Sequence, residues 1–137
     1  MDYSLIKYTH RIAIEIFSAG MTIALLGLIA RHYIEPQRWV GIAKKLRYFL
    51  ILPTGIIFIV VWILGIWMAV LAGWYEFIWF WLKIAILMAV SGVHGRVSKS
   101  YRLPDQASGS VLSDVVWLLA FVGMIAATVF LVLAKPF

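Results

Sequence analysis

Four long apolar segments alternate with short polar connections along the chain. They cover approximately residues 8–30, 47–72, 77–95 and 112–134. Each is long enough to cross a hydrocarbon core of roughly 30 Å as a helix that rises about 1.5 Å per residue. No alternation of polar and apolar residues predicts a strand. The pattern predicts an all-α membrane protein, a four-transmembrane-helix bundle in which residues 1–137 form a single integral membrane domain.

The polar connections carry signals of their own. Residues 31–46 contain Pro36 and a basic cluster, which predicts a short amphipathic helix at the membrane surface. Residues 103–111 contain proline, glycine and serine, and Ser113 and Asp114 are candidate caps for the last helix. An even number of spans places both chain termini on the same side of the membrane.

The lysine and arginine residues near the segment ends predict the orientation. The first and third connections carry eight of them, Arg31, Arg38, Lys44, Lys45, Arg47, Arg96, Lys99 and Arg102. The opposite side carries three, Lys7, Arg11 and Lys135. Because cytoplasmic loops carry the excess of basic residues, we expect the two basic connections in the cytoplasm. Both termini are then periplasmic if the membrane is a bacterial inner membrane.

Composition supports the membrane prediction and excludes several classes of function. Hydrophobic residues make up 64% of the chain and charged residues 13%, against about 45–50% and about 25% in soluble domains. The net charge of +6 lies at segment ends, which favours lipid head groups over nucleic acid as the partner. The absence of cysteine excludes disulfides and thiolate metal sites. The first apolar run is too long for a cleavable signal, so we expect it to be retained.

Lys83 and Glu15 are charged residues in the interior of apolar segments. Lys83 is expensive in a membrane helix, by ~2.5–3.5 kcal/mol on insertion scales, so it should face protein or water. Glu15 lies in the first segment and has two candidate partners. It can pair with Arg11, four residues earlier, near the outer surface. It can also form a buried pair with Lys83, which would mark a functional site. The sequence leaves both pairings open.

Three histidines, His10, His32 and His94, are the candidates for cofactor chemistry. Two neutral imidazoles can hold a haem iron axially when their helices bring them to similar depth. In the predicted helices, His10 and His94 differ in depth by roughly 25 Å, whereas His32 and His94 differ by about 5 Å. Spacing therefore favours His32 with His94 and leaves His10 as a lone ligand or for another site. Structural roles are the alternative, including a solvated one for His32.

Small residues predict close helix packing in the first two segments. In the first, Ala13, Gly20, Ala24 and Gly27 share one face. In the second, Pro53, Gly55 and Gly65 predict a bend or a close contact.

Short motifs in the first three segments also resemble those of a known family. They are Lys7 with His10, Arg31-His32, Pro53, Trp81-Leu82-Lys83 and His94-Gly95-Arg96. With them the chain resembles the bacterial HemJ-type protoporphyrinogen oxidases and the wider copper-resistance-D-like membrane superfamily. The resemblance implies an inner-membrane protein that binds haem b, oxidises the porphyrin substrate protoporphyrinogen and passes electrons toward the respiratory chain.

The resemblance also implies roles for individual residues. His10 matches the first-helix histidine of the family, and Lys83 and His94 match the lysine and histidine of its third helix. His10 and His94 would bind the haem iron. Lys83 would hold a propionate or pair with Glu15, and these two residues are the catalytic candidates.

The chain departs from the family pattern at four places. Lys7 and His10 are three residues apart, where the family spacing is tighter, and the spacing of His32 is off by one residue. The family's arginine in the latter half of the first helix has no counterpart among residues 25–28, and Ser113 and Asp114 stand where the family has a different polar motif. Losing that arginine removes a natural carboxylate clamp. The resemblance therefore implies the fold and haem binding more directly than it implies catalysis.

Two other classes of function stay open. A non-catalytic accessory subunit would dock on a larger respiratory or photosynthetic membrane complex, or on further copies of itself, through its small-residue faces and tryptophans. A copper transport or resistance protein is the third possibility. Its methionines are scattered without a ligand-like cluster, which disfavours it.

Overall fold

Five α-helices make up the computed structural model, which describes residues 2–106 and 109–134. They are α1 (Tyr3–Ala30), α2 (Pro36–Leu46), α3 (Leu52–Ala72), α4 (Ile78–Arg102) and α5 (Val111–Ala134). Four helical runs, with α2 and α3 counted as one, are long and apolar enough to cross a membrane. The described chain contains no strand, so the predicted all-α four-helix bundle is confirmed. Lys135, counted above among the basic residues, lies outside the described range.

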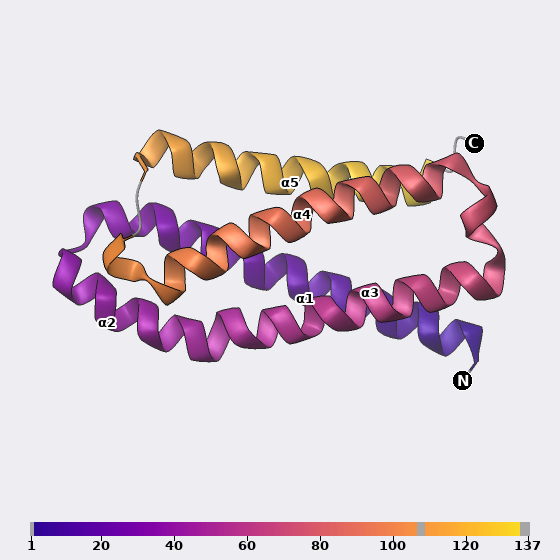
Figure 1. Ribbon diagram of the computed structural model, residues 1–137, viewed down its shortest axis with the longest axis horizontal. Coiled ribbons are helices and arrows are strands. Elements are labelled where there is room, and N and C mark those ends of the chain that lie inside the picture. The colour runs from indigo at the N-terminus through magenta and orange to yellow at the C-terminus, as the bar shows by residue number, and fades with distance from the viewer. Residues whose placement is uncertain (1, 107–108, 135–137) are drawn as a thin grey trace.

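The N-terminal end of α1 and the C-terminal end of α5 lie at the same end of the bundle (Figure 1). We call this the terminal end. The opposite end, where α1 meets α2 and α4 approaches α5, carries the basic connections and is called the basic end. The turn at Trp74–Glu76 lies at the terminal end, and the ring centroids of Trp74 and Tyr3 are 6.4 Å apart.

The connection after α1 is helical but does not form a separate surface helix. Helix α2 starts with Pro36 at its first position, where the missing N–H costs nothing. It then continues into α3 through a π-helical turn at Arg47–Ile51, so that α2 and α3 follow one gently curved line (Figure 1). Trp39 is buried, and its ring centroid lies 5.6 Å from that of Tyr101 on α4. Helix α2 therefore extends the bundle at the basic end.

Helix α4 is longer than predicted, because it continues from Ile78 to Arg102 instead of ending near residue 95. The polar residues after His94 do not break the helix, since none of them is a proline and Lys99 and Arg102 occupy the last turn, where basic side chains favour a helix C-terminus. His94 consequently lies about 12 Å before the end of the helix.

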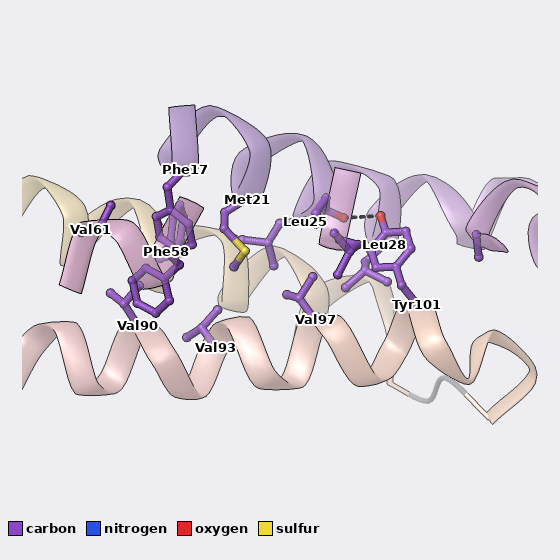
Figure 2. Close-up of a cluster of buried hydrophobic side chains, with 14 of the residues drawn as sticks. Phe17, Met21, Leu25, Leu28, Phe58, Val61, Val90, Val93, Val97 and Tyr101 are labelled. Carbon is purple, nitrogen blue, oxygen red and sulfur yellow. Dashed lines mark hydrogen bonds between the residues drawn. The ribbon is translucent and has the colours of Figure 1, made fainter. Parts of the chain in front are cut away.

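The core is built around α1, which contacts α3, α4 and α5 and packs most extensively on α3. Figure 2 shows the apolar face of α1 directed toward the facing side chains of α3 and α4. The rings of Phe17 and Phe58 stack with centroids 4.2 Å apart. The buried residues of this cluster include Phe17, Met21, Leu25, Leu28, Phe58, Val61, Val90, Val93, Val97 and Phe121.

The small-residue face of α1 lies against its neighbours, as predicted. A Cβ at Gly20 would lie 2.6 Å from Oγ1 of Thr54, and one at Gly27 would overlap the hydroxyl of Tyr101. That hydroxyl donates a hydrogen bond to the Ala24 carbonyl, 2.6 Å away. Glycine at these positions allows the helices to approach closely.

The start of α5 is capped by a residue that the sequence reasoning did not single out. The backbone N–H of Ser113 donates to Oγ of Ser110 at 3.1 Å, which satisfies a donor that the first turn leaves without a helical partner. The prediction that Ser113 or Asp114 caps this helix is therefore wrong. Asp114 instead lies in the first turn, and its carboxylate faces α1.

Candidate functional site

His10 lies inside the bundle at the terminal half of α1. Its side chain is only 6% exposed, and its ring rests on Gly65 of α3, where a Cβ would lie 3.1 Å from Cε1. The ring fits here because glycine has no side chain. The ring also interacts with the backbone of Val61, yet the buried Nδ1 has no hydrogen-bond partner among the described residues.

Lys83 on α4 is the second polar residue at this point. It is 8% exposed and interacts electrostatically with the His10 ring. Burying an ammonium in a membrane span is costly, so its position beside a histidine needs an explanation. The structure thus brings together two of the predicted site residues, one from the first span and one from the third.

Glu15, the other catalytic candidate, faces away from the bundle. Its Oε1 lies 3.2 Å from Nε of Arg11, and the two side chains are 64% and 79% exposed. The predicted Arg11–Glu15 pair is therefore confirmed.

His94 occupies a second position of the same kind. Its ring lies between Phe17 and Phe58, with centroids 6.0 and 5.8 Å away, and rests on Gly55, where a Cβ would lie 3.4 Å from Cε1. Its Nε2 is buried and has no hydrogen-bond partner in the described chain. Two glycines of α3 thus each receive a histidine ring, one from α1 and one from α4.

The two histidines do not meet. Gly55 and Gly65 are separated by about 15 Å along α3, whereas two axial nitrogens on one metal lie only about 4 Å apart because each bond is about 2 Å long. The separation is smaller than the 25 Å predicted, because the longer α4 moves His94 toward the middle of the bundle. His10 and His94 would each serve a site of its own.

The structure also does not bring His32 and His94 together. His94 packs beside Phe17, and His32 lies about 22 Å further along the first span. Nε2 of His32 is instead 2.6 Å from Oδ2 of Asp114, and Nη2 of Arg31 is 3.2 Å from the same oxygen. This cluster joins the basic ends of the first and last spans. The sequence indicated that these residues could be close, because the end of the first span and the start of the fourth lie on the same side of a four-span bundle.

An apolar hollow of about 360 Å³ lies between α3 and α4 at the terminal half. Its lining includes Trp62, Ile66, Phe80 and Ile84. Ile66 and Trp81 in its lining are about half exposed, so the hollow opens on the outer side of the bundle, and His10, Gly65 and Lys83 do not line it. Its volume falls within the range of small-molecule sites, about 300–1,000 Å³.

No cluster of three or more His, Cys, Asp or Glu side chains that could hold a metal ion occurs in residues 2–106 and 109–134. A haem iron takes its equatorial ligands from the porphyrin and needs only axial ones from the protein. Comparisons with protein-family models, with curated proteins and with solved structures found no match. The resemblance to the HemJ-type oxidases is carried by the short motifs alone.

Proposed function

We propose that this chain is a HemJ-like, b-type-haem-binding redox protein of the bacterial inner membrane, which oxidises protoporphyrinogen and passes the electrons toward the respiratory chain. The observation that carries the proposal is the burial of His10 against Gly65 inside the bundle, with Lys83 close enough to interact electrostatically with its ring. A histidine with an open ring nitrogen and a lysine together inside a membrane bundle form a functional site by default.

The residues around His10 fit an axial ligand. A ligating imidazole needs one nitrogen free for the metal, and a hydrogen bond from the other fixes its orientation. Nδ1 of His10 has no partner, and the ring interacts with the Val61 backbone. Gly65 leaves room beside the ring that any larger residue would occupy. When bound, haem would supply a one-electron redox centre that the side chains lack.

Lys83 has a different role from His10 in this proposal. Haem and protoporphyrinogen both carry propionates, and the ammonium of Lys83 is the charged group beside His10 that attracts a carboxylate. It would replace the arginine that the resemblance leads us to expect and this chain lacks.

His94 also has a ring nitrogen without a hydrogen-bond partner in the described chain and rests on Gly55, so the spectra of His10→Ala and His94→Ala together must assign the ligand. The protein is expressed with haem supplementation, purified in detergent, and examined before and after dithionite reduction. We expect a Soret band that shifts on reduction and is lost in His10→Ala. His32→Ala is the matched control, because its ring is bonded to Asp114, and it should retain the band. A colourless wild type, or a His10→Ala variant with the full spectrum, would contradict haem binding at His10.

The enzymatic part needs its own experiment. A strain that lacks protoporphyrinogen oxidation is complemented with the wild type or with Lys83→Met, which keeps the length of the side chain and removes its charge. We expect growth with the wild type and weaker growth with Lys83→Met at equal haem content. Failure of a well-expressed, haem-loaded wild type would reject the oxidase activity and leave haem binding standing.

A further inference from the structure

An ion pair lies on the outward face of α1, far from either end of the helix. Arg11 and Glu15 are 79% and 64% exposed and contact each other at 3.2 Å. Helix α1 runs from Tyr3 to Ala30, so Glu15 lies about 2 Å and Arg11 about 8 Å from its midpoint. Of the exposed charged side chains in the described chain, Glu15 lies farthest from either end of its helix.

If α1 spans the membrane, Glu15 lies near the middle of the span and Arg11 lies one helical turn closer to the terminal end. The level of Tyr3 is marked by its contact with Trp74, in the aromatic turn at the terminal end. Arg31 marks the basic end through its contact with Asp114. Arg11 and Glu15 lie between these levels, where a monomer would present both charges to lipid. Because the other helices pack on the opposite face of α1, the chain itself does not cover them.

The polar residues around the pair follow the spacing of a helix–helix seam. Ser4, Arg11, Glu15, Ser18 and Thr22 are separated by seven, four, three and four residues, which keeps them on one face. Thr22 donates from Oγ1 to the Ser18 carbonyl at 2.8 Å, so this hydroxyl is satisfied within α1. Arg11 and Glu15 are therefore the polar groups on this face that a partner helix would contact.

We propose that this face of α1 packs against the same face of a second copy of the chain, in a parallel two-fold dimer. Within the span the face carries one positive and one negative charge, Arg11 and Glu15, so this part of it is complementary to itself; Lys7, on the same face, lies one turn nearer the terminal end. Copies with the same sequence insert in the same orientation, and a two-fold axis along the membrane normal then places equal residues at equal depth. Arg11 of one copy and Glu15 of the other differ in depth by about 6 Å, which an arginine side chain can span.

In the dimer each Glu15 carboxylate accepts hydrogen bonds from two Arg11 guanidinium groups. The four charges are then buried between the two helices and no longer face lipid. An unrelated helix would have to carry an acid and a base at matching positions, whereas a second copy carries them by construction. The seam does not depend on haem binding, since it lies on the face of α1 that points away from the bundle.

Crosslinking can test the seam directly, because the chain contains no cysteine. Ser4→Cys and Thr22→Cys place a thiol on the seam, toward the terminal and basic ends of α1. Ile59→Cys is the matched control, since it is 59% exposed on the outward side of α3. Each variant is purified, reconstituted alone in phospholipid vesicles and oxidised. We expect disulfide-linked dimers for both seam variants and not for the control; equal crosslinking at all three positions, or none on the seam, would overturn the proposal.

Charge variants test the ion pairs. Arg11→Leu with Glu15→Leu removes both charges, and we expect dimerisation in vesicles to weaken about tenfold, from two lost pairs of about 0.7 kcal/mol each. Exchanging the residues, Arg11→Glu with Glu15→Arg, restores complementarity and should preserve dimerisation, whereas Arg11→Glu alone should not. Circular dichroism confirms that each variant folds. Single-molecule photobleaching that shows one copy at every lipid ratio would overturn the proposal, as would crosslinking in native membranes only to a different protein, which would favour the accessory-subunit alternative.

Discussion

At the basic end of the bundle, Asp114 accepts contacts from Arg31 and His32, which lie more than eighty residues away in the chain. In the other half, His10 and His94 each rest on a glycine of α3 and keep one buried ring nitrogen without a partner. The same residue type is therefore used in two ways. His32 contacts Asp114 and so links the first and last spans. His10 and His94 each keep one buried ring nitrogen without a hydrogen-bond partner in the described chain.

The difference distinguishes polar groups that are paired within the fold from polar groups that are not. Buried polar groups in folded proteins are almost always hydrogen-bonded, because leaving one without a partner costs free energy. The network at Asp114 follows this rule and contributes to stability. His10 and His94 violate it at positions where a glycine makes room, and such violations are expected where a ligand binds.

The largest effect should follow from breaking the network. Asp114→Ala leaves Arg31 and His32 partly buried without their carboxylate, and removing one partner of a buried pair typically costs about 3–5 kcal/mol. We expect a loss of this size in the free energy of unfolding, measured by denaturant titration in detergent with tryptophan fluorescence. Asp105→Ala removes an exposed carboxylate and should change it by less than about 0.5 kcal/mol. Equal effects of the two substitutions would mean that the network contributes little.

The next largest effect is expected at the contact between His10 and Gly65. Gly65→Ala adds a methyl group 3.1 Å from Cε1 of His10, and we expect overpacking to cost about 1–3 kcal/mol and to shift the ring. The Soret band proposed for the haem complex should weaken in parallel. Gly92→Ala, on α4 with nothing within 4 Å, should be neutral or stabilise the helix by up to about 1 kcal/mol. If Gly65→Ala changes neither the free energy of unfolding nor the spectrum, the His10 ring does not depend on the space that Gly65 leaves.

The bundle could be predicted from the sequence because apolar length alone decides whether a helix spans a membrane. The small-residue face of α1 could also be predicted, since glycine and alanine at helical spacing have few other uses in a span. The end of α4 could not. Polar residues after His94 indicate the membrane boundary, but a helix can continue through that boundary into water. Because α4 extends to Arg102, the sequence placed His94 too close to the end of its helix, and this changed each predicted depth difference that involved His94.

The partners of the polar residues were harder still to predict. The local Arg11–Glu15 pair was one of two predictions, because residues four apart on a helix are neighbours. The His10–Lys83 contact and the Asp114 cluster depend on how the helices rotate against one another, which a single sequence does not determine. Gly65 could be singled out as a packing position, but the ring that it receives could not.

The smallest effect concerns a hydrogen bond at the basic end, where the buried indole nitrogen of Trp39 also lacks a hydrogen-bond partner among the described residues. Tyr101→Phe removes the hydroxyl that donates to the Ala24 carbonyl at 2.6 Å, and Tyr101 is fully buried. Because Ala24 lies in the interior of α1 and its carbonyl keeps its helical acceptor role, we expect a loss of only about 1 kcal/mol in the free energy of unfolding. Tyr33→Phe, 78% exposed, is the control and should change nothing measurable. A loss as large as that of Asp114→Ala would show that the hydroxyl contributes as much to the stability of the basic end as the carboxylate cluster does.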